Sequence, residues 1–414
     1  MIDASAFIET LNQKPVAVFG LGASGMATLK WLHQNNINTF AWDDKKENRQ
    51  AAEGQGAKVQ NLNSDILKNC SCLVLSPGVP LTHPEPHDVV KAANAAKCEI
   101  IGDIEIFHRC ASAYQTIGIT GTNGKSTTTA LLTHTLNACG KTALMGGNIG
   151  TPILNLTPQD KNTIIVIEMS SYQIDLCPTF RPDIGILLNI TPDHIDRHGT
   201  FENYTAIKHR LLEGAKHKIY AEQCDQSILQ DHNFPMLPGN HNAQNIIAVL
   251  ETCTALGLNQ DDVIKAIKTF PGLAHRQYLV RTINNVTYIN DSKATNAEAT
   301  SKALSCQDNI YWIVGGQAKA GGLDGLEEFS SRITKAYLIG EAANDFQTWM
   351  NDQKIKSTIT QTLDNAILQA HNDAQDQGKP ACILLSPACA SWDQFKSFEH
   401  RGDQFIQYVE SLPA

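Results

Sequence analysis

The chain lacks the features of membrane and secreted proteins. No apolar run in its 414 residues approaches the length of a membrane span, and its first five residues have neither the basic start nor the apolar core of a signal peptide. Its eleven cysteines include no Cys-x-x-Cys pair, so neither a zinc site nor a disulfide framework is indicated. We therefore expect a cytoplasmic protein with reduced thiols and no membrane partner.

The chain also has little of what nucleic-acid-binding or disordered proteins need. Its net charge of −9 and isoelectric point near 5.9 argue against nucleic acid as the main partner. It has no repeat or low-complexity stretch, and a composition of 42% hydrophobic and 18% charged residues is typical of a folded globular protein. At this length we expect two or three domains.

A glycine-rich loop at residues 118–129, with the sequence GITGTNGKSTTT, lies between a strand-like step and a helical run. Glycines let backbone N–H groups face an anion, the helix N-terminus adds partial positive charge, Lys125 can reach the outer phosphates, and Ser126 can hold Mg²⁺. The ordinary P-loop has glycine where this chain has Ile119. A chance glycine-rich turn is the alternative, but the order of strand, turn, lysine, hydroxyl and helix favours binding of ATP or GTP.

The N-terminal part of the chain predicts a Rossmann-like sheet. The apolar run 16–19 leads into the glycine turn Gly20–Gly25, and a second run, 39–42, delivers Asp43 and Asp44. A glycine turn followed by an acid about twenty residues later is the dinucleotide fingerprint, in which the acid accepts a ribose hydroxyl. The pattern is weak by itself and does not say which nucleotide binds.

Two further strands complete this part. Residues 72–75 run into the rigid turn Ser76–Pro80, and ligands of open α/β sheets bind at such carboxyl ends of strands. The strand 99–101 follows, and we place the first domain boundary after it, near Gly102 and Asp103.

The central part carries polar residues at the tips of two buried strands. Residues 164–167 end at Glu168, and an acid beside a phosphate loop is where nucleotide enzymes hold Mg²⁺. Residues 184–190 lead to Asp193 and His194. This pair can hold a metal, or it can be a helix N-cap beside a solvated histidine, and these residues alone leave both open.

The pattern changes again around Pro271 and Gly272, where a third, doubly wound unit is predicted. Its strands are expected at 286–289, 310–314, 336–339 and 382–385. Polar clusters follow three of these strands, at 290–296, 315–319 and 386–393. Caps and turns would explain each cluster alone, but three at the same edge favour a binding rim.

Three motifs carry a resemblance to a known family: the loop GTNGKS, the tip NDSKATN at 290–296 and the run SPACASWDQF at 386–395. Together they resemble the Mur ligases of bacterial peptidoglycan synthesis over essentially the whole chain. The loop alone marks the superfamily, which includes folylpolyglutamate synthases with Gly where Ser126 stands here. The SPACAS run, with Phe395 and Phe398 behind it, is similar to the members that add D-glutamate.

The resemblance implies an α/β fold of three domains. They would be a Rossmann-like domain at 1–102 for the UDP-substrate, a P-loop NTPase-like parallel sheet at 103–272 for ATP, and a Rossmann-like domain at 273–414 that binds the amino acid and closes over ATP.

The resemblance also implies an ATP-dependent ligase. ATP would phosphorylate the alanine carboxylate of UDP-N-acetylmuramoyl-L-alanine, and the amine of D-glutamate would attack the acyl phosphate, which releases ADP and phosphate. An amide cannot form from a free carboxylate because the oxide is too poor a leaving group, so catalysis is positioning and charge neutralisation. Two Mg²⁺ ions and a monomeric protein are expected.

Site residues follow from the same resemblance. Lys208 would be carbamylated and anionic, whereas an ordinary helical lysine is exposed to solvent. The catalytic residues would be Lys125, Glu168, His194 and Lys208, and the metal ligands Ser126, Glu168, His194 and the Lys208 carbamate. ATP would contact Gly121, Thr122, Asn123, Gly124, Lys125, Ser126, Thr127, Asn242, Asn245, His275, Arg276, Asp291 and Lys293. The UDP-substrate would contact Ala23, Ser24, Gly25, Asp43, Asp44, Gly78 and Asn148, and D-glutamate would contact Thr295, Lys319, Ser391 and Phe398.

Two segments depart from the family pattern. Residues 316–324 are glycine-expanded, which leaves the reach of Lys319 open, and the run Asp-Asp-Lys-Lys at 43–46 leaves open which acid contacts the uridine. Three other functions were weighed. A Rossmann oxidoreductase leaves the Lys125 loop unexplained, a folylpolyglutamate synthase-like ligase shares that loop, and an ATP-gated binding protein without chemistry conflicts with a complete set of catalytic residues.

Overall fold

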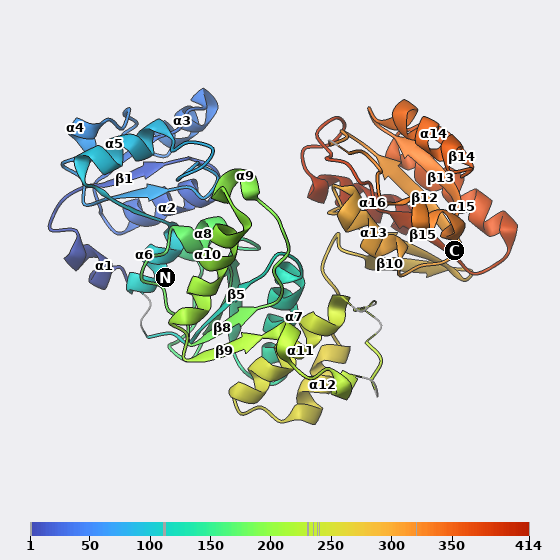
Figure 1. The fold of residues 1–414 in the computed structure, drawn as a ribbon, viewed down its shortest axis with the longest axis horizontal. Coiled ribbons are helices and arrows are strands. Elements are labelled where there is room, and N and C mark those ends of the chain that lie inside the picture. The colour runs from blue at the N-terminus through green and yellow to red at the C-terminus, as the bar shows by residue number, and fades with distance from the viewer. Residues whose placement is uncertain are drawn as a thin grey trace. The chain divides into compact units, whose positions relative to one another are not determined.

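A computed structural model describes the chain except for residues 1, 111, 112, 230, 231, 235, 238, 240, 320 and 414. The described residues divide into two compact units (Figure 1). The first comprises 1–233 with 241–270, and the second comprises 234–240 with 271–414. Among the described residues, none of the helices combines the length and apolar character that crossing a bilayer requires.

The first unit begins with a four-stranded parallel sheet in the order β2-β1-β3-β4. All four strands coincide with the predicted ranges, because buried parallel strands read as continuous apolar runs. The strands are β1 (Val16–Phe19), β2 (Thr39–Trp42), β3 (Cys72–Leu75) and β4 (Glu99–Ile101). The helices are α1 (Ser5–Thr10), α2 (Ala23–Gln34), α3 (Lys46–Glu53), α4 (Ser64–Leu67), α5 (Asp88–Ala96) and α6 (Asp103–Cys110).

The glycine turn after β1 holds α2 against the sheet. Gly20 has φ +90°, a left-handed conformation that favours glycine. Gly25, in the first turn of α2, lies so close to it that a Cβ atom on Gly25 would be 1.9 Å from the carbonyl oxygen of Gly20. The N-terminus of α2 is therefore pressed onto the turn, at the carboxyl edge of the sheet.

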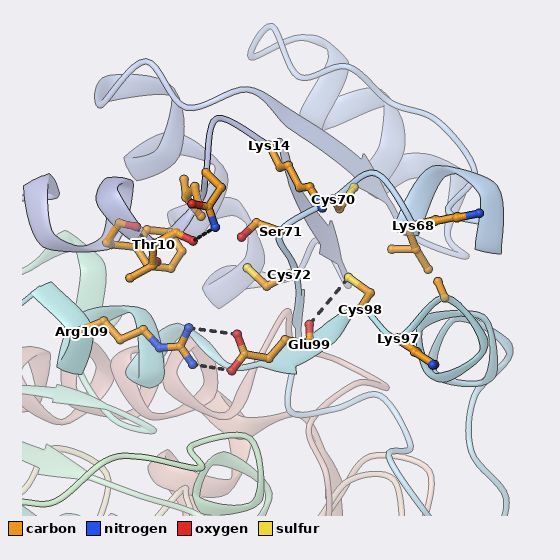
Figure 2. A pocket seen from close by; sticks show the side chains of 15 residues that line it. Thr10, Lys14, Lys68, Cys70, Ser71, Cys72, Lys97, Cys98, Glu99 and Arg109 are labelled. Atoms are coloured by element: carbon orange, nitrogen blue, oxygen red, sulfur yellow. Dashed lines mark hydrogen bonds and ion pairs between the residues drawn. The ribbon is translucent and has the colours of Figure 1, made fainter.

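A cavity of about 400 Å³ lies at the opposite, amino edge of this sheet (Figure 2). Lys14, Lys68 and Lys97 line it together with Cys70 and Cys98. Burial raises the pKa of both thiols to about 11, so they are protonated at neutral pH. The eleven cysteines are all free, which agrees with the expectation of reduced thiols.

A five-stranded parallel sheet, ordered β6-β7-β5-β8-β9, forms the other part of the first unit. The predicted strand 184–190 is too long, because β8 ends at Leu187. The strands are β5 (Thr116–Thr120), β6 (Ala143–Gly147), β7 (Ile164–Glu168), β8 (Ile184–Leu187) and β9 (His217–Tyr220). The helices are α7 (Lys125–Ala138), α8 (Ser171–Asp175), α9 (Ile195–His198), α10 (Phe201–Glu213), α11 (His241–Ala255) and α12 (Gln260–Lys268), with short 3₁₀ turns at Ile153–Asn155, Ala221–Gln223 and Ser227–Leu229.

The second unit contains a six-stranded sheet in the order β10-β11-β15-β12-β13-β14. It is parallel except that β10 runs antiparallel to β11. Its strands are β10 (Tyr278–Ile283), β11 (Val286–Asn290), β12 (Ile310–Gly315), β13 (Ile333–Ile339), β14 (Ser357–Gln361) and β15 (Ala381–Leu385). Its helices are α13 (Ala297–Leu304), α14 (Ala343–Asp352), α15 (Leu363–Gln377) and α16 (Phe398–Ser411), with a 3₁₀ helix at Glu327–Arg332.

Three predominantly parallel sheets with helices between their strands confirm the predicted α/β class. The predicted domain limits at residues 102 and 272 stay a prediction. In the structure the first two sheets belong to one compact unit, and the two units are divided between Phe270 and Pro271.

The glycine turn gives a first testable prediction. Replacing Gly25 by Ala should lower the free energy of unfolding of the first sheet by about 1–3 kcal/mol, because the new Cβ overlaps the Gly20 carbonyl. Gly22→Ala is the matched control, because a Cβ atom on Gly22 meets nothing within 4 Å and its φ is −72°. Thermal unfolding of both variants checks this, and equal melting temperatures would contradict it.

Candidate active site

The phosphate loop connects β5 to α7. Gly124, the N-cap of α7, has φ +85°, and a Cβ atom there would lie 2.2 Å from Oδ1 of Asn245. Nζ of Lys125 donates to the carbonyl oxygens of Gly121 (2.9 Å) and Thr122 (2.8 Å). The ammonium group therefore lies over the loop, beside the start of a helix whose exposed N–H groups attract anions.

The tip of β8 holds this loop in place through Asn189. The carbonyl oxygen of Asn189 accepts from the N–H of Thr122 at 2.9 Å, and its Oδ1 accepts from the N–H of Asn123 at 2.8 Å. The hydroxyl groups of Thr122 and Tyr204 are 3.1 Å apart. No local sequence pattern marks Asn189, because its role depends on the neighbouring loop.

Helix α11 brings two of the predicted ATP-binding residues to the same place. Oδ1 of Asn245 accepts from the hydroxyl of Thr128 on α7 at 3.1 Å, and Nδ2 of Asn245 donates to Oδ1 of Asn242 at 2.9 Å. Both asparagines are buried. Their amides thus lie next to the phosphate-loop helix, and their contact with adenine stays a prediction.

Glu168, at the end of β7, has one carboxylate oxygen that its surroundings leave unsatisfied. The side chain is 1% exposed, and its Oε1 accepts from Nδ2 of Asn148 at 2.8 Å. Oε2 is buried and has no hydrogen-bond partner among the described residues. A buried anionic oxygen without a donor is a costly arrangement that a cation relieves. The unsatisfied Oε2 therefore fits a Mg²⁺ ligand. The hydrogen bond through Oε1 joins Glu168 to Asn148, a predicted substrate-binding residue.

Lys208 on α10 is buried, so the alternative of an exposed helical lysine is wrong. The side chain is 1% exposed, and Nζ donates to the carbonyl oxygen of Gly121 at 2.8 Å and to Oγ1 of Thr120 at 3.4 Å. Burial above all, together with the nearby charge of Lys125 and against a smaller opposing effect of Asp193, lowers the pKa of Lys208 to about 7. At neutral pH a large fraction of Lys208 is a neutral amine.

Asp193 and His194 lie where the chain enters α9. His194 is the N-cap residue in the left-handed conformation (φ +53°), and its side chain makes no capping hydrogen bond. Its Nε2 is 3.4 Å from Oδ2 of Asp193, and its ring packs 5.0 Å from that of Tyr172. No group of three or more His, Cys, Asp or Glu residues suited to hold a metal occurs in the described part of the chain. The predicted ligand set contains only two such residues, so it stays a prediction.

Two acids lie at the carboxyl edge of the first sheet, and the structure gives them different surroundings. Oδ2 of Asp43 accepts from the N–H of Leu21 at 2.6 Å, and Oδ1 accepts from the N–H of Lys45 at 2.8 Å. Burial would raise the pKa of Asp43, but these hydrogen bonds and one from Asn48 lower it overall. Asp44 is exposed and contacts His87 at 3.0 Å. Asp43 thus fixes the glycine turn, in which Ala23, Ser24 and Gly25 begin α2.

In the second unit, the polar clusters predicted at the strand tips do meet. Nζ of Lys319 donates to Oγ1 of Thr295 at 3.3 Å, and Nζ of Lys293 lies 4.9 Å from the ring centre of Phe398. Asp291 accepts from the hydroxyl of Ser386 at 2.8 Å, and burial raises the pKa of this acid to about 7.

Three other predicted residues of this unit are also placed. Ser391 is buried, and its carbonyl oxygen accepts from the N–H of Phe395 at 2.8 Å. His275 is buried, and its carbonyl oxygen accepts from the N–H of Lys293 at 3.0 Å. Arg276 follows it in the same turn, before β10.

Comparison with known proteins places this fold and site in a family. Residues 119–233 match the model of the Mur ligase middle domain, and residues 14–102 match that of the MurD-like N-terminal domain of Mur ligases. The chain is 43% identical over 458 residues to the UDP-N-acetylmuramoylalanine--D-glutamate ligase of Nitrobacter winogradskyi, with 98% of each chain covered. The chain belongs to the Mur ligase family. The ligase of the same name from Brucella abortus is 44% identical, with 98% of this chain and 97% of the relative covered.

Solved Mur ligase structures share the fold at low identity. The UDP-N-acetylmuramate-alanine ligase MurC of Thermotoga maritima aligns with a TM-score of 0.59 and 15% identity, covering 96% of this chain and 99% of that one. The MurF ligase of the same organism, in complex with ADP, aligns with a TM-score of 0.53 and 18% identity, covering 84% and 91%.

Arg401 on α16 was not among the predicted site residues of this Mur ligase. It connects the segment after β11 with the segment after β15. It is fully buried, its Nε donates to Oγ of Ser292 at 2.9 Å, and its Nη2 donates to the carbonyl oxygens of Ser292 (2.9 Å) and Cys389 (3.1 Å). Burial lowers the pKa of Arg401 to about 10. It thereby holds the tip after β11 against the tip after β15. No local motif signals this, because its acceptors are mostly backbone carbonyls.

The lowered pKa of Lys208 predicts a pH-dependent stability. Between about pH 7 and the ordinary lysine value of 10.5, the unfolded chain binds a proton that the folded protein does not, so the free energy of unfolding rises with pH. Replacing Lys208 by Met should remove this rise. Melting temperatures at pH 7 and pH 9, in metal-free and CO₂-free buffer, measure it.

Lys218, an exposed lysine on β9, provides the control as Lys218→Met. This variant should keep the pH dependence of the wild type. Parallel pH profiles of Lys208→Met and the wild type would contradict the assignment of a neutral buried amine.

Proposed function

We propose that this protein catalyses the ATP-dependent addition of D-glutamate to UDP-N-acetylmuramoyl-L-alanine, with release of ADP and phosphate, in the synthesis of peptidoglycan precursors. The observation that carries the proposal is the match, over 98% of both chains, to a relative bearing the name of that ligase. The site geometry supports it, because the phosphate loop, Glu168 and Lys208 converge at the carboxyl edge of one sheet.

The phosphates of ATP bind at the loop between β5 and α7. Backbone N–H groups at the start of α7 and the ammonium of Lys125 neutralise the γ-phosphate while the alanine carboxylate attacks it. One P–O bond breaks, ADP leaves, and an acyl phosphate forms. The amine of D-glutamate then attacks the acyl carbon, loses a proton, and expels phosphate. Asn242 and Asn245 lie beside α7, where they would contact the adenine.

Ser126, Glu168, His194 and a carbamate on Lys208 would hold the Mg²⁺ ions. Bound Mg²⁺ supplies charge neutralisation for the phosphates. The unsatisfied Oε2 of Glu168 supports this assignment. The neutral amine of Lys208 supports the carbamate, because only an unprotonated amine adds to CO₂, and the product carboxylate gains one negative charge as a proton leaves.

D-Glutamate would bind at the strand tips of the second unit. Lys319 and Thr295 already form a hydrogen-bonded ammonium–hydroxyl pair, which suits one carboxylate of the amino acid. Ser391 and Phe398 would flank the other carboxylate. The first-sheet residues Ala23 to Gly25, Asp43, Asp44 and Gly78 would hold the UDP group. We propose a cytoplasmic monomer with no macromolecular partner.

The proposed function predicts the amino-acid specificity. Phosphate release from ATP should require both UDP-N-acetylmuramoyl-L-alanine and D-glutamate, and L-glutamate should support little turnover. A site built for one arrangement of two carboxylates leaves buried charges unpaired with the mirror image, which costs several kcal/mol. A coupled phosphate assay with each candidate amino acid measures this. Comparable turnover with L-glutamate, or with a pteroate as acceptor, would overturn the assignment.

Lys125 gives a second prediction. Replacing it by Ala should lower kcat by about 10²–10³-fold or more, because one preorganised positive charge on the transferring phosphate is lost. We expect the fold to be retained, because the ammonium donates to carbonyl oxygens of its own loop at the surface of the site. Near-normal ligation by a folded Lys125→Ala protein would show that the loop is a structural turn.

A further inference from the structure

The four-residue helix α9 joins the two sheets of the first unit. It begins after His194, the predicted metal ligand, and ends at His198, with Gly199 as its C-cap. Figure 1 shows α9 next to α8 and α10 of the second sheet. Its side chains reach in two directions: Arg197 contacts the turn that follows β3 in the first sheet, and His198 contacts the start of α8.

Arg197 holds the turn after β3 by its backbone. Its Nη1 donates to the carbonyl oxygen of Gly78 at 3.0 Å, and its Nη2 donates to those of Val79 at 2.9 Å and Pro77 at 3.4 Å. The guanidinium also lies 4.6 Å from the ring centre of Tyr172 on α8. One side chain therefore binds three consecutive carbonyls of one sheet and an aromatic face of the other.

A second contact with the loop after β3 is made by Gly199, the C-cap of α9. Gly199, with φ +79°, lies against the imidazole of His83, which is in the loop between β3 and α5. A Cβ atom on Gly199 would be 2.6 Å from Nε2 of that ring. The loop between β3 and α5 thus contacts α9 at two places, through the carbonyls that Arg197 binds and through His83.

On the side of the second sheet, α9 is anchored by His198. Nε2 of His198 lies 2.9 Å from Oγ of Ser171, and its ring stacks on Tyr172 at 5.3 Å between centres. His194 also packs on Tyr172. These contacts hold α9 against the five-stranded sheet. The hydrogen bonds of Arg197 in turn hold the turn that contains Gly78 against α9.

We infer that Arg197 is a positioning residue. It sets the distance between the phosphate loop and the turn after β3, which contains Gly78 and is proposed to bind the sugar nucleotide. At that distance the substrate carboxylate reaches the γ-phosphate of ATP. This role rests on the proposed function. Its chemistry explains the choice of arginine. A planar guanidinium binds several carbonyls at once and stacks on a ring, whereas an ammonium does neither equally well. The contacts described for Arg197 are with three backbone carbonyl oxygens and the face of the Tyr172 ring.

The experiment compares Arg197→Ala and Arg197→Lys with a matched control, Arg181→Ala. Arg181 also donates from Nη1 to backbone carbonyls, those of Pro178 and Phe180, but within its own loop. We measure kcat, the KM of each substrate and the melting temperature. A misplacement of about 1 Å between reacting groups lowers the rate by about 10²-fold. We expect that loss in kcat for Arg197→Ala and a smaller loss for Arg197→Lys.

The remaining readouts separate positioning from a general structural role. The KM for ATP should stay within about twofold of the wild type, because the phosphate loop is untouched. Millimolar guanidinium should restore part of the kcat of Arg197→Ala, and Arg181→Ala should keep the wild-type kcat. Wild-type kcat in Arg197→Ala would overturn the inference. So would a loss of kcat that follows a lowered melting temperature and is not restored by guanidinium.

The wild-type protein tests the proposed function in the same assay. If it releases phosphate with D-glutamate while Arg197→Ala does so equally well, only the inference fails. If the wild type shows no D-glutamate-dependent release, the proposed function is overturned, and the ligation role of Arg197 with it.

Discussion

Close packing around the phosphate loop is the constraint on which the rest of the site depends. The loop leaves no room for side chains at its glycines: a Cβ atom on Gly124 would lie 2.2 Å from Asn245, and one on Gly121 would lie 3.0 Å from Leu188. Helix α11 and the tip of β8 therefore press directly on the first turn of α7. Because protein interiors are packed as densely as crystals, the loop has one conformation to adopt, and its N–H groups are oriented before any phosphate arrives.

The same packing affects the protonation of the ionisable side chains in the site. The carbonyl oxygen of Gly121 accepts hydrogen bonds from both Lys125 and Lys208. Two ammonium groups so close to one another are unfavourable in a buried place. The burial of Lys208, which is 1% exposed, and to a lesser extent the charge of Lys125 lower the pKa of Lys208 to about 7. Beside them, Glu168 keeps a buried oxygen without a donor. The folded protein thus holds a reactive amine and an unsatisfied carboxylate at one edge of a sheet, and both suit a metal-dependent transfer of phosphate.

Ligation of two substrates requires that separate sheets keep a fixed distance, and α9 meets this need within the first unit. The element is too short to be stable by itself, because a single helical turn gains little from its own hydrogen bonds. Its stability comes from Arg197, His198 and Gly199, which contact both sheets. His194, the proposed metal ligand, and the turn at Gly78, proposed to bind the sugar nucleotide, are therefore both held by α9.

Much of the fold could be predicted from the sequence. Many central strands, such as β1, β3, β12 and β15, are apolar runs, and the glycine turns after β1 and β5 are local motifs. The strands that sequence reasoning missed, β6, β9, β10 and β14, are all at the edges of their sheets. Edge strands are paired with only one neighbour and are less covered, so β9, β10 and β14 carry few buried residues, and none of them has an apolar run longer than three residues.

The residues of the candidate site also fall into those that the sequence indicates and those that only the structure reveals. Sequence alone determined the phosphate loop, the acid at Glu168 and the family motifs, because each is a short pattern of residue types with a direct chemical meaning. Only the tertiary structure decided that Lys208 is buried, that Asp43 anchors a turn, and that Arg197 and Arg401 bind backbone carbonyls. The physical reason is that a carbonyl is present at every residue. No residue type marks which carbonyl an arginine will reach, and the desolvation that shifts the pKa of a lysine depends on what the fold packs around it.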